Sequence, residues 1–473
     1  MALRHAKTPN DELSGCLREL GWSPKTLARR INKLMGQGCV SESTPYYWRD
    51  EGGVPHPPVP GIVAHVLSCE LGRPIPVDWL WQGKATETPC LVPATAGMDL
   101  PWSLPSVLRL TEDWLVGGLM DRRIFLAVAG SAITALAWDY TNLEPARLAA
   151  ALHGDRTGET LVRQIEATIP GLRALDDSEG GASGLTYARA QFQAVSLLLH
   201  KGLHSGDVTR RLLVALGELG QTTGWMAFDS GQHGLAQRYF LTALRAAREA
   251  NDRSLAAHIL GDLCYQAACR GIGVDAVEIG EAAVRAAESA TRTARASVIT
   301  RLGYAYAVAS DTDGFARARG MARELFESHC PGLDPSWAYY LSESHLDAQA
   351  GYSLVHMGRN RLAEGNRNGA KRLLSQGEKL LAPYASVGAD DPFQRHALFE
   401  GTWLAIAQTA QGELEHACTT ARAALRRLDQ VQSPRCMDLL ATLRADLGRG
   451  RHNNLAVREF LPELDRAIRR FAA

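Results

Sequence analysis

Apolar side chains recur every three to four residues along most of this chain, which is the spacing of amphipathic helices. The pattern predicts five helices near the N-terminus: residues 10–20, a helix after Ser23, "TPYYWRDEGG" with Thr44 as its cap, "VPGIVAHVLSCELG", and a short one in "PVDWLWQG". Ser23 and Thr44 each precede a proline, and a hydroxyl cap followed by proline is typical of a helix start. From Val107 onward the helical spacing continues without a convincing β-rich run, so the chain is predicted to be all-α.

A self-similar pattern recurs in the second half of the chain. Each copy is a turn rich in Gly, Asp or Asn, followed by an amphipathic helix, and the copies are indexed by Ala236, Val277, Ala316, Ala370 and Ala417. Their spacings of 41, 39, 54 and 47 residues are longer and less regular than the spacing of about 34 in tetratricopeptide repeats. A helical hairpin fits each period, which predicts a right-handed, tetratricopeptide-like α-solenoid whose inner helices line a concave wall.

Composition suggests where the domains begin and end. Four prolines lie between residues 84 and 106, as in a domain linker. The predicted order is therefore a helix-turn-helix domain (1–83), a Pro-rich linker (84–106), a connecting helical segment (107–175) and the repeat domain (176–473). The apolar run Met120–Ala137 is expected to be a buried helix, because it lies inside the chain and is shorter than the ~20 residues of a membrane helix.

The overall composition is that of a globular protein without a membrane segment. Hydrophobic residues make up 46% and charged residues 22% of the 473 residues, and 51 Lys and Arg balance 51 Asp and Glu. Nine cysteines are scattered without the spacing of a metal site, and no apolar signal segment opens the chain. A cytoplasmic protein with reduced thiols is expected.

The first domain has the helix order of a helix-turn-helix domain of the lambda-repressor type, which binds double-stranded DNA. Cations at spacings of three to four share a face of the second helix and suit phosphate contacts: Lys25, Arg29, Arg30 and Lys33. The next helix would bring these residues to base edges or phosphates: Ser43, Thr44, Tyr46, Tyr47 and Arg49.

An alternative is a protein–protein interaction scaffold whose helix-turn-helix-like domain no longer binds DNA. Residues 1–84 carry ten Lys and Arg against eight Asp and Glu, a net charge of only +2. Asp50 and Glu51 follow Arg49, and acids close to phosphates weaken binding. The DNA-binding interpretation therefore requires that the helix around Tyr46 is open and that the neighbouring cations are not held in internal ion pairs.

The stretch "LARRIN … STPYYWRDEGGVPHPPVPGIVAHVLSCELGRPI" resembles a family of actinobacterial transcriptional regulators with an N-terminal helix-turn-helix and C-terminal tetratricopeptide-like repeats. The matching positions are Leu27, Ala28, Ile31, Asn32, Thr44, Trp48, Gly52, Pro55, Val63, Ala64, Leu67, Ser68, Leu71, Gly72 and Arg73. The segment "MDRRIFLAVAGSAITALAWDY" also resembles one found between the two regions of these proteins. The resemblance implies a function in transcription regulation.

The repeat domain offers anchors for an effector, which could be a peptide, a small molecule or a protein. The aromatic candidates are Trp337, Tyr339, Tyr340, Tyr304 and Trp403. "SWAYYL" stands out, because three aromatics in four residues cannot share one helical face. A homodimer is expected, since two-fold pairing reads two half-sites roughly 34 Å apart or a multiple of that.

Catalytic signals are weak, and neither an enzyme, a cofactor nor a metal is expected. "HKGLH" places His200 and His204 four residues apart, but Lys201 stands where zinc proteases need a glutamate, so surface histidines are expected. "GIGVDA" (271–276) follows a predicted helix, so we interpret it as an interhelical turn and not a dinucleotide site.

The phosphate-binding hypothesis predicts that Arg30→Ala weakens binding to all DNA sequences alike and flattens its salt dependence by about one phosphate contact. Affinity measured at several salt concentrations tests this, and an unchanged salt slope would refute the assigned role of Arg30.

Overall fold

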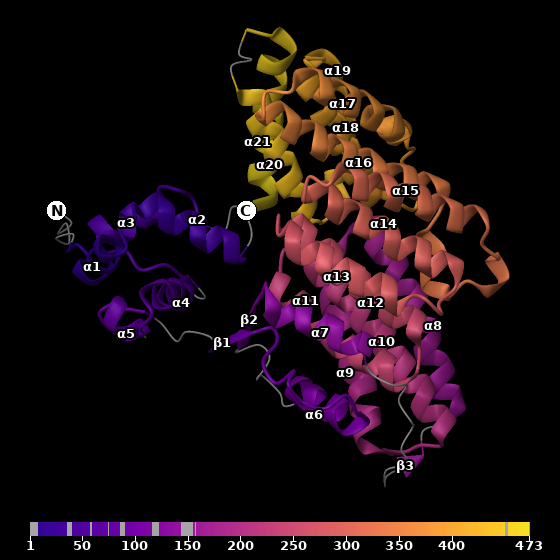
Figure 1. Cartoon of the computed structure of the whole chain (residues 1–473). Helices are drawn as coiled ribbons and strands as arrows, with labels where there is room; N and C mark the ends of the chain where they lie inside the picture. The colour runs from indigo at the N-terminus through magenta and orange to yellow at the C-terminus, as the bar shows by residue number, and fades with distance from the viewer. Residues whose placement is uncertain are drawn as a thin grey trace. The chain divides into compact units, whose positions relative to one another are not determined.

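The computed structural model describes residues 8–35, 40–56, 59–73, 75–85, 90–115, 123–142, 155–156, 158–449 and 453–472. These residues form 21 α-helices, four 3-10 helices and four strands of two to four residues, so the fold is all-α (Figure 1). No helix in these ranges is both long enough and apolar enough to span a bilayer.

The chain forms two compact units. The first gathers residues from Met1–Ala96, Val116–Val128 and Gly231–Leu235, and the second gathers residues from Gly97–Leu115, Ala129–Ser230 and Ala236–Ala473. The first unit contains α1 (Asp11–Glu19), α2 (Pro24–Met35), α3 (Thr44–Asp50), α4 (Val59–Leu71), α5 (Val77–Leu80), β1 (Cys90–Pro93) and β2 (Arg123–Leu126).

The helices of the first unit share one apolar core. Leu27 and Ile31 of α2 and Leu67 of α4 are fully buried in it. Trp48 of α3 meets Trp81, the residue after α5, edge to face at 6.0 Å between ring centroids. The face of α3 that carries Trp48 is therefore fixed by packing, which leaves its opposite face outward.

Two details of this unit differ from the expectations. α3 begins at Thr44, so Ser43 is the residue preceding the helix, and no side-chain cap bond forms there. The predicted buried helix over 120–137 is wrong in its first half, because Arg123–Leu126 is strand β2, paired in parallel with β1. The helical part begins later, as α7 (Ser131–Asn142).

The second unit begins with α6 (Leu104–Leu115), α7, and the two-residue parallel strands β3 (Asp155–Arg156) and β4 (Gly202–Leu203). Long helices follow: α8 (Glu159–Glu179), α9 (Gly181–Lys201), α10 (Gly206–Asp229), α11 (His233–Glu249), α12 (Arg253–Cys269), α13 (Gly273–Ala286), α14 (Arg292–Val308) and α15 (Thr312–Glu327). The C-terminal helices are α16 (Glu343–Ala363), α17 (Arg367–Leu381), α18 (Gln394–Gln411), α19 (Leu414–Leu425), α20 (Pro434–Gly448) and α21 (Leu455–Ala472).

The five indexed repeat positions fall on alternate helices, namely α11, α13, α15, α17 and α19. The helices between them pack on one another in succession, α12 on α14, α14 on α16, α16 on α18 and α18 on α20 (Figure 1). Close packing uses small residues: a Cβ at Gly377 of α17 would lie 2.7 Å from the Gly351 carbonyl oxygen of α16. Of these intervening helices, α12, α14, α16 and α18 are buried over more than half of their residues.

The longest repeat spacing has a structural cause. Between α15 and α16 the chain inserts the 3-10 helices η1 (Pro331–Leu333) and η2 (Ser336–Tyr340). The remaining 3-10 helices, η3 (Ala382–Ser386) and η4 (Arg426–Asp429), follow α17 and α19. The aromatic cluster "SWAYYL" thus lies in an insertion, where the 3-10 helix η2 places Trp337 and Tyr340, three residues apart, on one side, and both rings approach His258.

Asn10→Ala is predicted to destabilise the first unit by about 1–3 kcal/mol. The Asn10 side chain accepts from the Leu13 N–H and donates to the Leu80 carbonyl, both buried bonds. Chemical denaturation followed by tryptophan fluorescence measures the change.

Ser23→Ala is the matched control, since the Ser23 hydroxyl accepts from the Thr26 N–H at an exposed site and makes no long-range bond in the described part. An equal loss for both variants would contradict a tertiary role for Asn10.

Candidate functional site

The outward face of α3 carries the residues expected to contact bases. Tyr46 and Tyr47 are 40% and 53% exposed, while Trp48 is 3% exposed. The Ser41 hydroxyl bonds to those of Ser43 and Thr44 at 3.0 and 2.7 Å, which orients a row of hydroxyls at the start of the helix. This face meets the condition that the helix is open within its own unit.

The neighbouring cations do not meet the second condition. Lys25 Nζ and Arg29 Nε contact Glu42 at 2.5 and 3.0 Å, and Arg30 contacts Glu70 at 3.5 Å. The expectation that these side chains stand free for phosphates is therefore wrong in this state, because a glutamate before α3 neutralises two of them. The side chain of Lys33 lies outside the described part.

Arg49 is also engaged locally. Its guanidinium makes two hydrogen bonds to Asp50 and lies 5.2 Å from the Tyr46 ring centroid. The hydrogen bond from Arg49 lowers the pKa of Asp50. All of these pairs are at least 30% exposed, however, so water screens them and each contributes little to stability.

The second unit encloses a cavity of about 770 Å³, a volume that includes the solvent at its mouth. Four arginines line it: Arg173, Arg301, Arg395 and Arg435. Aromatic side chains form most of the remaining wall: Trp225, Tyr265, Trp337, Tyr339, Tyr340, Tyr352 and Phe399. A concave site with an apolar wall and a few directed polar groups is the usual form of a small-molecule site.

Three of the five expected effector residues lie on this wall. Trp337 is buried and stacks on His258 at 4.1 Å between centroids, and Tyr339 donates a hydrogen bond to Asp177. Tyr340 lines the cavity beside them. Tyr304 and Trp403 are not on the wall but behind it, each in ring contact with Tyr352.

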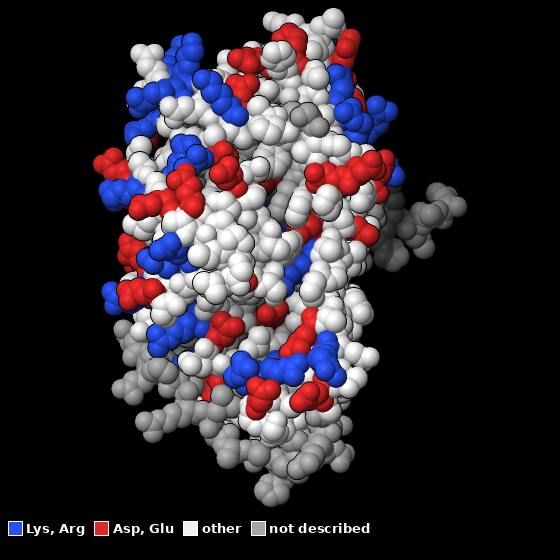
Figure 2. All heavy atoms as spheres, turned by 90° about the vertical axis from the view of Figure 1, so that its right-hand side faces the viewer, with Lys and Arg blue, Asp and Glu red and all other residues white. Residues whose placement is uncertain are grey.

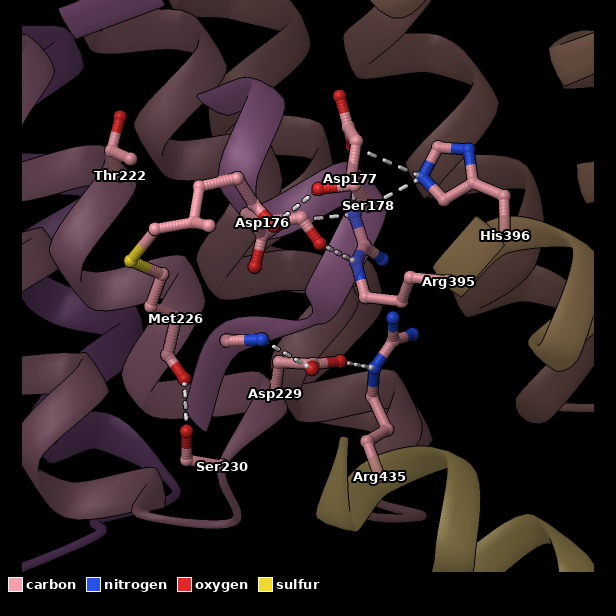
Figure 3. Close-up of polar contacts among 12 residues, drawn as sticks. Asp176, Asp177, Ser178, Thr222, Met226, Asp229, Ser230, Arg395, His396 and Arg435 are labelled. Atoms are coloured by element: carbon pink, nitrogen blue, oxygen red, sulfur yellow. Dashed lines mark hydrogen bonds and ion pairs between the residues drawn. The ribbon is translucent and has the colours of Figure 1, made fainter. Parts of the chain in front are cut away.

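Two sets of buried ion pairs join helices around the cavity (Figure 3). Arg395 of α18 contacts Asp176 and Asp177 of α8 at 2.9 and 3.0 Å, and Arg435 of α20 contacts Asp229 of α10 at 3.0 Å. These side chains are at most 11% exposed, so their interactions are far less screened than those near α3. These ion pairs join helices whose contacting residues lie more than 200 positions apart in the sequence.

A third ion pair lies beside the aromatic residues of the cavity wall. Arg301 contacts Asp262 at 2.8 Å and donates to Nδ1 of His258 at 2.8 Å. The Trp225 ring centroid lies within 6.0 Å of three guanidinium carbons, those of Arg301, Arg395 and Arg435. One indole therefore packs against the cationic groups of three different helices.

The histidines of the cavity are neutral. Burial, and then the charge of Arg301, hold the pKa of His258 well below its usual range. Burial likewise lowers the pKa of His345 to about 3, and that of His396 well below the usual range. At physiological pH these rings add no positive charge to the cavity.

Two acids of the wall have an oxygen without a hydrogen-bond partner. They are Oδ1 of Asp176 and Oε2 of Glu400, and both side chains are 4% exposed. Burial raises the pKa of Asp176 to about 7 and that of Glu400 to about 8. Burial acts on Asp229 in the same direction, but the charges of Arg435 and Arg395 outweigh it and lower its pKa.

The expectation of surface histidines at "HKGLH" is wrong for His204, which is buried with Nε2 2.9 Å from the Leu198 carbonyl oxygen. His200 lies 2.9 Å from the Thr111 hydroxyl. "GIGVDA" is an interhelical turn as predicted, with Gly271 at φ +72° between α12 and α13. Among the described residues no cluster of three or more metal-ligating side chains occurs.

Part of the chain is similar to a known protein family. A family model described as "SP15 N-terminal domain" matches residues 13–80, which covers α1 to α5. No curated protein shows significant similarity to the chain. The match concerns the first unit and does not extend to the cavity.

Glu400→Gln is predicted to raise the melting temperature by a few degrees at pH 8 and by less at pH 5. The native pKa of Glu400 lies above the unfolded value, so native Glu400 holds its proton up to about pH 8. The wild type therefore loses about 1.4 kcal/mol of stability per pH unit between the two pKa values, and glutamine does not. The charges facing this carboxyl are Arg395 and Arg435.

Glu415→Gln is the control for calorimetric melts across this pH range. Glu415 is exposed, and its pKa is lowered by the hydrogen bond from Asn454, so its substitution should not stabilise at high pH. A melting difference for Glu400→Gln that is constant from pH 5 to pH 8 would count against a buried, protonated Glu400.

Proposed function

We propose that this chain is a DNA-binding transcriptional regulator of the actinobacterial type that it resembles. Its first unit acts as a helix-turn-helix domain, and its second unit, a tetratricopeptide-like solenoid, binds an effector and dimerises. The observation that carries the proposal is the two-sided character of α3, whose Trp48 face is buried while Tyr46 and Tyr47 are exposed. A helix anchored on one side and open on the other is the geometry that major-groove binding requires.

The ion pairs of α2 weaken this proposal less than their number suggests. Water screens exposed pairs of this kind and each contributes little, so a phosphate can replace Glu42 as the partner of Lys25 and Arg29 at small cost. Glu42 then acts as a local competitor of DNA. Weak, strongly salt-dependent binding is the expected behaviour.

The cavity supports the effector-binding half of the proposal. It is lined by Trp337, Tyr339 and Tyr340, which come from the insertion between α15 and α16, and by side chains of α8, α10, α12, α14, α16, α18 and α20. A ligand bound there contacts most inner helices at once. Differential binding to two arrangements of those helices is how an effector could change DNA affinity.

A second candidate function is a scaffold for protein partners, in which the first unit does not bind DNA. Glu42, Glu70 and Asp50 favour it, because each neutralises a cation that DNA binding would use. The exposed Tyr46 and Tyr47 would then serve as anchors for a protein surface.

Glu42→Gln separates the two functions. If Lys25 and Arg29 bind phosphates, the variant should bind DNA about two- to fivefold more tightly. Its log–log salt slope should steepen by roughly 0.9 for each additional phosphate that the protein neutralises. Fluorescence anisotropy with a duplex from the promoter of the chain's own gene, at two salt concentrations, gives both quantities.

Glu19→Gln is the matched control, because Glu19 forms an equally exposed pair with Arg73 on α1, outside the α2–α3 surface. Equal increases in affinity for both variants would indicate only a change in net charge. No salt-sensitive binding by any of the proteins would favour the scaffold.

A further inference from the structure

The carboxyl groups of the cavity outnumber its guanidiniums. Four arginines line the wall, and three acids line it with them: Asp176, Asp177 and Glu400. Three more acids stand behind the wall as partners of the arginines, Glu218 with Arg173, Asp262 with Arg301, and Asp229 with Arg435. Six carboxyls thus face four guanidiniums, an excess of two acids in a site whose histidines are neutral.

The two acids with an unpartnered oxygen account for that excess. Asp176 uses Oδ2 for Arg395 and leaves Oδ1 without a partner, and Glu400 leaves Oε2 without one. Buried polar atoms without partners are costly and rare, so each one calls for an explanation. An ionised carboxylate only accepts hydrogen bonds, so a ligand that binds these acids in their ionised form must supply donors.

An anion does not fit this arrangement. Each wall arginine already contacts a carboxylate at 2.8–3.0 Å, so an incoming anion would compete with buried ion pairs. A cation with N–H groups does not compete with these pairs, and it supplies donors to the unpartnered oxygens in place of the protons that they give up.

The wall also favours a ligand with an apolar body. The rings of Trp225, Trp337 and Phe399 offer flat apolar surface to a small molecule. On the face drawn in Figure 2, Lys and Arg are interspersed with Asp and Glu, and uncharged side chains dominate the centre. Neither sign of charge prevails on that face.

We propose that the cavity binds a small organic cation, a protonated amine on an apolar or aromatic body, whose N–H groups bind Glu400 and Asp176. This inference rests on the effector-binding half of the proposed function and names the class of effector. Burial raises the pKa of Glu400 to about 8 and that of Asp176 to about 7, so an ammonium that binds these oxygens replaces the protons that the two acids still carry near neutral pH.

Phenethylamine, phenylethanol and phenylacetate test the proposal, since they share one body and differ in charge. Isothermal titration of the full chain at pH 7 should show phenethylamine binding at least roughly tenfold more tightly than the other two. Repeating the titration in phosphate and in Tris should show net proton release. Equal affinities, a preference for phenylacetate, proton uptake, or no binding of phenethylamine would overturn the proposal.

Glu400→Gln should reduce the preference for phenethylamine over phenylethanol by roughly tenfold, and Asp176→Asn provides a second, independent variant. Glu378→Gln is the matched control, because Glu378 is part-buried on α17, accepts from Gln408 and Gln411, and lies off the cavity wall. A preference that persists in folded Glu400→Gln and Asp176→Asn would refute the assigned role of these acids.

The experiments distinguish a failure of the regulator proposal from a failure of the cation-site proposal. Amine binding without salt-sensitive DNA binding would reject the regulator and leave the cation site standing. DNA binding without a preference for phenethylamine would leave the regulator standing and reject the cation site.

Discussion

The second unit depends on charged groups placed where water does not reach them. Arg395 and Arg435, from the last third of the chain, contact Asp176, Asp177 and Asp229 from α8 and α10. A buried ion pair is weak as a source of stability, because the cost of removing both charges from water offsets most of their attraction. Removal of one partner alone would be costly, since the unpaired buried charge left behind destabilises by about 3–5 kcal/mol. These pairs therefore restrict which helices can meet across the cavity more than they strengthen the packing.

Both units contain ion pairs, but the pairs around α2 and α3 of the first unit are exposed and those around the cavity of the second unit are buried. Around α2 and α3, Lys25, Arg29 and Glu42 pair in water, so these contacts exchange easily for other anions. Inside the second unit, Asp229 is fully buried and its partner Arg435 has few alternatives. A labile charged surface on one unit and a fixed charged interior in the other suit a protein that binds a polyanion with the first and a small ligand with the second.

Structural features that depend only on residues close together in the sequence could be predicted from it. The Ser23–Pro24 start of α2 and the alternating repeat helices followed from local spacing, and "SWAYYL" was identified because its rings cannot share one face. Strand β2 was missed, because its pairing partner β1 lies some 30 residues away and a four-residue apolar run is ambiguous between helix and strand. Arg395 and Glu400 were missed for the same reason, since their significance depends on residues of α8. One signal was present: α18 is buried on most sides, and a charged residue inside such a helix must itself be buried.

Main-chain contacts join the same elements as the Asp229–Arg435 ion pair. Gly180, between α8 and α9, has φ +85°, and a Cβ there would lie 2.6 Å from the Gln432 carbonyl oxygen just before α20. The Ala182 N–H donates to that same carbonyl, and the Gly181 N–H donates to Asp229, the partner of Arg435. The first long helices of the unit and the loop before α20 are thus joined by main-chain bonds and by the Asp229–Arg435 pair within a few residues. Because Arg435 also lines the cavity, a ligand that changes its surroundings acts directly on the contact that joins α8 and α10 to α20. Under the proposed function, this contact is the place where a ligand in the cavity would alter the arrangement of the helices.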